Sequence, residues 1–265
     1  MKGRKSLYGA SNRTVEVKPR GSEARVDSTS STRRFERPMF NGNLMEEICD
    51  RNNLQMALKR VIDNKGSAGV DGMTAEELPD FLRNHWSVIL NQLLSGNYIP
   101  QPIKRVEIPK PNSQEKRKLG IPTCVDRLIQ QATLQILQRK WDPYFSDNSF
   151  GFRPGRSCHQ AINQVQKYLQ DGYEFVVDID LSKFFDRVCH DRLMMKLVEV
   201  IPDPRVLKLI RSYLTAGILE NGLISVPKEG TPQGGPVTPR TQLTLFLGTD
   251  WNDMFHVNFL FDRIY

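Results

Sequence analysis

Apolar residues recur at helical spacing in several stretches of the chain, and each stretch ends at a glycine or a polar break. The first stretch covers residues 43–64 and breaks at Lys65-Gly66, while the second covers residues 75–94 and is followed by Gly96. Apolar positions three and four apart share one face of a helix, so both stretches predict amphipathic helices. The apolar positions of the first stretch are Leu44, Ile48, Leu54, Leu58, Val61 and Ile62.

Two later helices are predicted from capping signals. Thr123 stands three residues before Asp126, and Ser157 stands three residues before Gln160. At this spacing a hydroxyl oxygen accepts a hydrogen bond from a backbone N–H that the first helical turn leaves free. Gly172 is placed to end the second of these helices. Helical spacing predicts two more helices, one from about Asp191 and one over residues 204–216.

Strand signals lie between the helical stretches. Asn221-Gly222 separates two short apolar pairs, which is the pattern of a tight β-hairpin turn. Upstream, residues 175–180 read FVVDID and alternate in a way that predicts a strand. Strands interleaved with helices predict an α+β fold class.

Residues 175–186 read FVVDIDLSKFFD and contain two carboxylates at alternate strand positions. Alternation would turn Val177 and Ile179 toward a core and place Asp178 and Asp180 together on the other face. Carboxylate oxygens are the ligands of hard divalent cations, and two-metal sites for nucleotidyl transfer hold their ions about 4 Å apart. The residues alone leave open a surface strand with solvated acids.

Five sequence blocks follow one another along the chain. They are GSAGVDG at 66–72, IPKPNSQEKRKLGIPTCVDRLIQQA at 108–132, FSDNSFGFRPGRSCHQAI at 145–162, the acidic segment at 175–186, and EGTPQGGPVTP at 229–239. In this order they resemble the blocks of group II intron reverse transcriptases, also called maturases, over about residues 45 to 239. The resemblance implies the fingers and a partial palm of a right-hand polymerase. It also implies RNA-directed DNA polymerase activity with an intron RNA template, a DNA primer, deoxynucleoside triphosphates and Mg²⁺.

The resemblance assigns roles to individual side chains. Asp180 matches the metal ligand of the first acidic motif and would be catalytic, with Asp178 as its companion ligand. Lys110 and Arg117 match the basic finger residues that hold the triphosphate of the incoming nucleotide. Phe185 matches the aromatic residue that lies under the sugar, clashes with a 2′-OH and so selects deoxyribonucleotides.

Two glycine-containing segments complete the implied site. Gln233 and Gly234 match a turn that lies along template and nucleotide, where glycine permits close backbone approach. Arg153 and Arg156 lie in the GFRPGRS loop before a helix start and would hold nucleic-acid phosphate. Purely structural explanations stay open for several of these positions. Lys110 and Arg117 could be ordinary exposed cations, the GFRPGRS loop a surface turn, and Phe185 a core phenylalanine.

The family's second acidic motif, Tyr-x-Asp-Asp, is absent from the sequence. No two aspartates are adjacent anywhere in the 265 residues, and Asp250 and Asp253 lack the spacing of the motif. We expect a truncated member of the family, whose residues from Arg240 come from another reading frame or a junction. Polymerase activity of this chain alone is then not expected, and it is uncertain whether the chain is an enzyme. An intron RNA-binding fragment without synthesis and a poorly folding pseudogene product remain open.

Charge and composition divide the chain into four predicted parts. Residues 1–40 contain ten Lys or Arg and four Asp or Glu, so they carry +6 of the net charge of +7. Their polar composition predicts a disordered basic tail. An N-terminal helical extension follows over 41–105, then the fingers and incomplete palm over 106–239, and an off-pattern segment over 240–265.

Cysteine spacing and hydropathy indicate the state of the thiols and the expected compartment. The four cysteines are far apart in the sequence, which favours reduced thiols over a disulfide framework or a zinc site. Cys158-His159 and Cys189-His190 lack complementary ligands at zinc spacing. No run of 18 apolar residues occurs, so we expect a cytoplasmic protein with no membrane partner. The sequence leaves the oligomeric state open.

Overall fold

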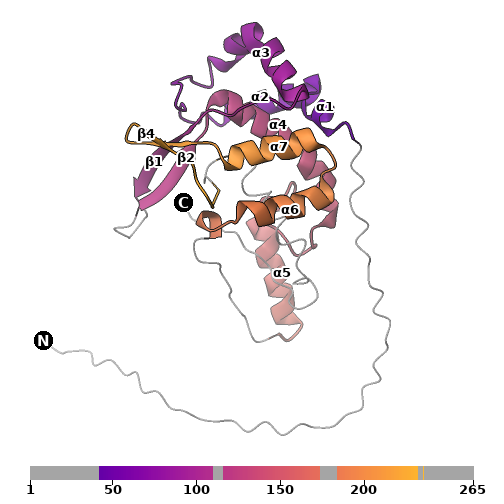
Figure 1. Cartoon of the computed structure of the whole chain (residues 1–265). Coiled ribbons are helices and arrows are strands. Elements are labelled where there is room, and N and C mark those ends of the chain that lie inside the picture. Colours follow the sequence, from indigo (N-terminus) through magenta and orange to yellow (C-terminus); the bar gives the residue numbers. More distant parts are fainter. Residues whose placement is uncertain (1–41, 110–115, 174–183, 232–234, 236–265) are drawn as a thin grey trace, which may run out of the picture. The chain divides into compact units, whose positions relative to one another are not determined.

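The computed structural model describes residues 42–109, 116–173, 184–231 and 235 (Figure 1). Helices and strands alternate along these residues, which confirms the predicted α+β class. The α-helices are α1 (Leu44–Ile48), α2 (Arg51–Asp63), α3 (Leu78–Leu94), α4 (Cys124–Trp141), α5 (Cys158–Gln170), α6 (His190–Val200) and α7 (Pro204–Leu214). The strands are β1 (Ile103–Pro109), β2 (Lys116–Ile121), β3 (Ile218–Glu220) and β4 (Leu223–Ser225), and the short 3₁₀ helices are η1 (Asp142–Tyr144) and η2 (Phe184–Asp186).

The first predicted helix, over residues 43–64, is wrong as a single element because the chain forms two helices there. Asp50 stands between α1 and α2, and its carboxylate accepts hydrogen bonds from the backbone N–H groups of Asn52 at 2.9 Å and Asn53 at 3.2 Å. An aspartate that caps a helix start in this way begins a new helix. The apolar spacing continued across the break and concealed it.

The predicted helix over 75–94 begins three residues later than expected. Glu77 accepts hydrogen bonds from the backbone N–H of Thr74 at 2.8 Å and from its hydroxyl at 2.9 Å, which holds the preceding residues in a turn. Proline in the first turn of α3 then favours helix from Leu78 onward. Gly96 follows the helix with a φ of 68°, as the sequence predicted.

Both predicted capping sites are confirmed. The hydroxyl of Thr123 accepts from the backbone N–H of Asp126 at 3.2 Å, and α4 begins directly after it. Ser157 and Gln160 form a reciprocal capping box at the start of α5. Gly172, with a φ of 91°, lies just past the end of α5.

The strands form one sheet in the order β2-β1-β3-β4. Strand β1 pairs antiparallel with β2 and parallel with β3, and β3 pairs antiparallel with β4. Asn221 and Gly222 join β3 to β4 with φ values of 51° and 80°. Two successive positive φ values are typical of the tight turn that the sequence predicted there.

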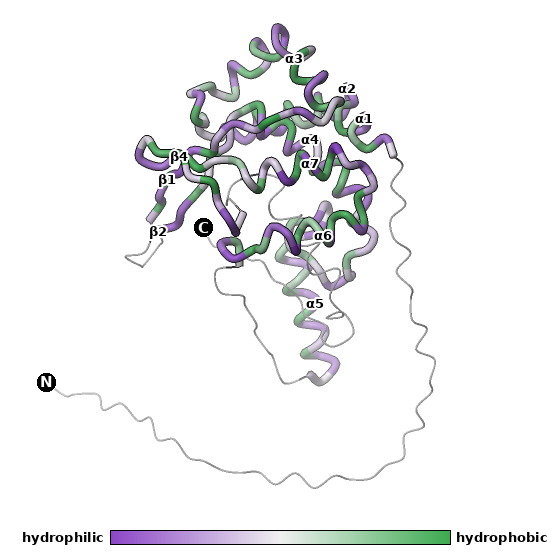
Figure 2. Tube along the Cα trace, in the orientation of Figure 1, coloured by the Kyte–Doolittle hydropathy of each residue, from purple (hydrophilic) through white to green (hydrophobic). Residues whose placement is uncertain are grey.

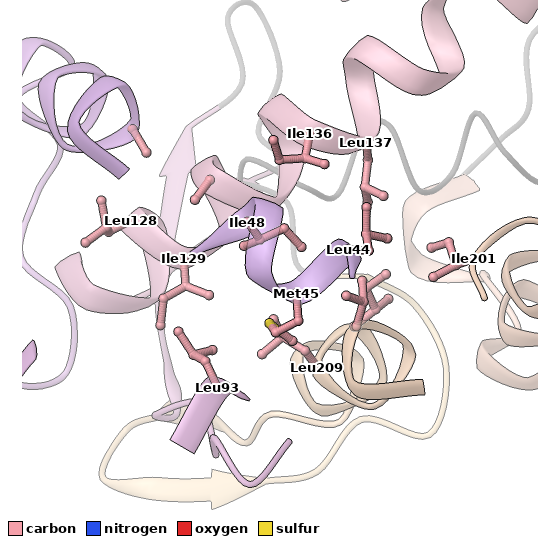
Figure 3. Close-up of a cluster of buried hydrophobic side chains, with 14 of the residues drawn as sticks. Leu44, Met45, Ile48, Leu93, Leu128, Ile129, Ile136, Leu137, Ile201 and Leu209 are labelled. Atoms are coloured by element: carbon pink, nitrogen blue, oxygen red, sulfur yellow. The ribbon is translucent and has the colours of Figure 1, made fainter. Parts of the chain in front are cut away.

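The hydrophobic core is built around α4. Thirteen of its 18 residues are buried, and the packing partners come from both sides of it in the sequence. Figure 3 shows Leu44, Met45 and Ile48 of α1 among Leu128, Ile129 and Leu209. Two buried amide side chains pair within this core, since the Gln135 amide donates to Asn53 Oδ1 at 2.8 Å and the Asn53 amide donates to Ala132 O at 3.1 Å.

One core therefore joins the predicted helical extension to the predicted fingers and palm. The boundary predicted between 105 and 106 lies within β1, and α1 and α2 pack on α4. The outer boundaries, at residues 40 and 239, fall outside the described residues and stay predictions. Within the described part of the chain, no helix is both long enough and apolar enough to cross a membrane.

Candidate functional site

Two segments that are more than 40 residues apart in the sequence meet next to η2. The backbone N–H of Thr231 donates to Phe185 O at 2.7 Å, and the N–H of Gly230 donates to Val188 O at 2.8 Å. The ring Nε2 of His190 lies 2.7 Å from Gly230 O. We call residues 185–190 together with 229–231 the junction. It joins the end of the acidic segment to the start of the PQGG turn.

The junction requires a glycine at position 230. Its φ is 83°, a region that other residues rarely adopt. A Cβ atom added there would lie 2.9 Å from Asp186 O and 3.1 Å from Phe185 O. The two backbones approach so closely that no side chain fits between them.

Phe185 is the one predicted nucleotide-selecting residue that the structure describes at this junction. Its side chain is partly exposed, and its carbonyl receives the hydrogen bond from Thr231. Asp178, Asp180, Lys110, Gln233 and Gly234 lie outside the described residues. Their predicted roles therefore stay predictions, although the residues that follow Asp180 and the residues that precede Gln233 meet at the junction.

The β1–β2 pairing sorts the basic side chains onto two faces of the sheet. Residues directly opposite in an antiparallel pair share a face, so Glu107 lies with Lys118, and Ile108 lies with Arg117. On the first of these faces, acids neutralise the cations. Lys116 pairs with Glu107 at 2.9 Å, and Arg105 and Lys118 approach Glu220 at 3.6 and 3.9 Å.

Among the described strand residues, the other face carries cations without acids. Lys104 and Arg117 lie on this face, and both are exposed. Neither makes an ion pair within the described residues, and the strand positions that share the face are apolar. These positions are Val106, Ile108, Leu119, Ile121, Leu219 and Ile224. An exposed guanidinium on an apolar surface suits a phosphate with a stacked or packed organic group beside it.

A buried carboxylate fixes the base of this hairpin. Asp126, near the start of α4, accepts hydrogen bonds from the Tyr98 hydroxyl at 2.9 Å, the Gln101 N–H at 3.1 Å and the Thr123 hydroxyl at 2.7 Å. Burial raises the pKa of Asp126, which these three hydrogen bonds partly offset. The chain entering β1 and the chain leaving β2 are thus held at one point. The sequence indicated Asp126 only as a capping residue.

The two predicted phosphate-binding arginines have different surroundings. The guanidinium of Arg153 is buried, and it donates to Asp142 Oδ1 at 3.1 Å, Ser146 O at 2.6 Å and Ser149 O at 3.1 Å. It therefore holds its own loop together. Arg156 lies nearer the surface, donating to Asp147 O at 3.0 Å and lying over the Phe150 ring. Nucleic-acid contacts by either residue stay predictions.

A metal centre cannot be assembled from the described residues. Within them, no group of three or more His, Cys, Asp or Glu side chains gathers at one point. The two aspartates predicted as ligands lie in the acidic segment outside these residues.

Comparisons with known proteins agree with this arrangement of segments. The sequence model of the family described as "Reverse transcriptase (RNA-dependent DNA polymerase)" matches residues 108–246, more than half of the chain. This family generally uses divalent metal ions. The junction and the Arg153 loop lie inside the matched region, and so does β2, whereas most of β1 precedes it.

Among the proteins that this chain resembles, two of the three that follow are named for introns. The chain is 40% identical over 193 residues to protein YkfC of Escherichia coli, covering 70% of this chain and 50% of YkfC. It is 38% identical over 184 residues to the group II intron-encoded protein LtrA of Lactococcus lactis, covering 69% of this chain and 30% of LtrA. A shorter match, 37% over 93 residues, covers 35% of this chain and 13% of the mitochondrial nuclear intron maturase 1 of Arabidopsis thaliana. The chain thus spans half or less of these relatives' lengths.

A solved structure shares the fold. A chain of a partial Cas6-RT-Cas1–Cas2 complex superposes with a TM-score of 0.51 and 23% identity, covering 77% of this chain and 34% of that chain. The sequence matches and the shared fold lead to one conclusion. The chain belongs to the reverse transcriptase family, among the group II intron reverse transcriptases and maturases.

Proposed function

We propose that this chain carries the part of an RNA-directed DNA polymerase that holds the intron RNA template, the DNA primer and the incoming deoxynucleotide. The main support is the junction, where Thr231 N–H donates to Phe185 O at 2.7 Å. This contact brings the segment that follows the first acidic motif against the segment that leads into the PQGG turn. In the family these two segments face the same nucleotide.

Each predicted residue except Arg153, which holds its own loop together, has a role in this proposal. Arg117, with Lys110, would neutralise the triphosphate, and Phe185 would exclude a 2′-OH. Asp178 and Asp180 would supply carboxylate oxygens to Mg²⁺, which neutralises charge that develops during nucleotidyl transfer. Gln233 and Gly234 would lie along the template and nucleotide, with Arg156 near the backbone phosphates.

A second candidate function is RNA binding without synthesis. It is favoured by the absence of adjacent aspartates from all 265 residues, because the acidic segment alone supplies too few carboxylates for two metal ions. In this case the basic hairpin would hold intron RNA, and no primer would be extended.

One experiment separates the two functions. Binding of a labelled RNA template–DNA primer hybrid is measured by fluorescence anisotropy over a series of KCl concentrations, and primer extension with deoxynucleotides and Mg²⁺ is followed in the same samples. Both functions predict binding that weakens with salt, and binding without any extension would favour the second function. Extension that Asp180→Ala abolishes would instead show that these residues suffice for synthesis.

A matched pair of arginine variants tests where the nucleic acid binds. Arg117→Met should weaken binding and lower the salt slope by about one, the value for one lost phosphate contact. Arg83→Met is the control, because Arg83 lies on α3 with 77% of its side chain exposed and pairs only with Asp80 among the described residues. Equal effects of the two variants, or binding that salt does not weaken, would contradict the proposal.

A further inference from the structure

We infer that His190 is a positioning residue that holds the junction in register and thereby sets how strongly the site discriminates against a ribose 2′-OH. This inference rests on the proposed function, since it concerns the same nucleotide site. His190 is the first residue of α6, and only 4% of it is exposed. It matches none of the residues to which the family resemblance gave a role.

The hydrogen-bond partner of His190 shows which ring nitrogen carries a proton. Nε2 of His190 lies 2.7 Å from Gly230 O, and a carbonyl oxygen only accepts hydrogen bonds. Nε2 therefore carries a proton and donates it to this contact. The bond is buried, so breaking it leaves a carbonyl without the water that would replace the donor at a surface.

His190 adds a side-chain hydrogen bond to the two backbone hydrogen bonds of the junction. Gly230 and Thr231 also donate backbone hydrogen bonds to Val188 O and Phe185 O, at 2.8 and 2.7 Å. These two bonds depend on main-chain atoms, whereas the third depends on the imidazole of His190. Val188 is buried in the hydrophobic core, which anchors the whole junction to α6 and α7.

The consequence for selectivity comes from the position of Phe185. If the Gly230 carbonyl moves, Thr231 moves with it, and the hydrogen bond that fixes the Phe185 backbone weakens. A steric gate works only when the aromatic ring is held at a fixed distance from the sugar, and displacements of about 1 Å are known to change reaction rates strongly. A loosened junction should therefore accept a 2′-OH more readily, with less effect on binding of the triphosphate.

The test compares three histidine variants in the full chain. His190→Leu keeps apolar volume but removes the donor, while His190→Gln keeps an N–H donor. His85→Leu is the control, because His85 also has a ring nitrogen 2.8 Å from a backbone carbonyl, that of Phe81, but lies exposed on α3. A photoreactive deoxynucleoside triphosphate is cross-linked to each protein with Mg²⁺ present, and unlabelled deoxy- and ribonucleotides compete.

The measured quantity is the ratio of ribonucleotide to deoxynucleotide concentrations that give equal competition. For His190→Leu we expect this ratio to fall by about fivefold to tenfold, the effect of one buried hydrogen bond. His190→Gln should stay within about twofold of the unmodified chain, since it keeps the donor. Amide hydrogen exchange at Gly230 and Thr231 should accelerate in His190→Leu alone, while exchange in α4 stays unchanged.

Phe185→Val distinguishes failure of this inference from failure of the proposed function. If Phe185→Val abolishes discrimination and His190→Leu preserves it, the inference is wrong and the proposed function stands. If the unmodified chain does not discriminate, both are wrong. Should His190→Leu not fold, as judged by a lost cooperative melt, His190→Asn replaces it. Its shorter donor does not reach Gly230 O, so a ratio equal to that of His190→Gln would overturn the inference.

Discussion

Helices α4 and α5 begin in the same way but differ in how much of each helix is buried. Each starts at a hydroxyl residue that caps the first turn, Thr123 for α4 and Ser157 for α5. In α4, 13 of 18 residues are buried, whereas Ala161 is the one buried residue in α5. Figure 2 shows hydrophobic and hydrophilic residues alternating along α5, yet Ile162 and Leu169 are 53% and 54% exposed.

The difference shows that helix formation and helix burial have separate causes. Capping side chains and apolar spacing are local, so both helices form where the sequence predicts them. Burial depends on partners from elsewhere in the chain. Helix α4 has them in α1 and α2, while α5 has no comparably extensive contact with another described element. Local signals therefore predict where a helix is but not how much it stabilises the fold.

The largest expected effect comes from one substitution made in both helices. Ile129→Ala in α4 removes a side chain that is 1% exposed and should lower the free energy of unfolding by about 2–5 kcal/mol. Ile162→Ala in α5 should change it by less than about 0.5 kcal/mol, because Ile162 is already 53% exposed. Chemical denaturation monitored by circular dichroism measures both. Similar losses would show that α5 is covered in solution.

A second pair of substitutions compares the two arginines that precede α5. Arg153→Met removes buried hydrogen bonds to Asp142 and two carbonyls, and should destabilise the chain by about 2–3 kcal/mol. Arg156→Met should cost less than about 1 kcal/mol, since its ion pair with Asp147 is at the surface. Thermal melts provide the comparison. A larger loss for Arg156 would contradict the roles assigned to these side chains.

The capping residues themselves form a third pair. Ser157→Ala should cost about 1 kcal/mol, the usual effect of losing a cap. Thr123→Ala should cost about 2 kcal/mol, because the Thr123 hydroxyl also donates to the buried Asp126 carboxylate. Urea titrations resolve a difference of this size. Equal costs would mean that the Thr123–Asp126 contact contributes no stability.

The smallest expected effect is a pH dependence of stability caused by Asp126 in α4. Burial raises the pKa of Asp126, so the folded state binds a proton more readily than the unfolded chain does. Stability from this protonation is fully present below the unfolded pKa and is lost as the pH rises through the folded pKa. The unmodified chain should therefore gain stability relative to Asp126→Asn as the pH falls from 7. A constant difference across this range would contradict the raised pKa.

The sequence predicted the local features of the fold well. Thr123, Ser157 and Asn221-Gly222 act on residues within a few positions of themselves, so their effects can be predicted without the rest of the chain. Asp50 is also a local signal, but continuous apolar spacing concealed the break it makes. Contacts between residues that are far apart in the sequence could not be predicted, because the spacing of residues does not identify the partner.

The junction illustrates that limit within the candidate site. The resemblance predicts a role for Phe185, but the hydrogen bonds from Thr231 to Phe185 and from Gly230 to Val188 cross more than 40 residues of sequence. His190 was considered only beside Cys189 as a weak metal pair, because no local pattern reveals a ring bonded to Gly230 O. No sequence signal indicated that the Arg153 guanidinium is buried against Asp142, Ser146 and Ser149, and its predicted phosphate contact stays a prediction.

The most direct test of the account is to locate where a nucleotide binds. A photoreactive deoxynucleoside triphosphate is cross-linked to the chain in the presence of an RNA–DNA hybrid, and the labelled peptides are identified by mass spectrometry. We expect labels in the basic hairpin, residues 103–121, and in the junction, residues 185–190 and 229–231. Labels confined to α2 and α3, or labels that excess unlabelled deoxynucleotide does not suppress, would contradict the account.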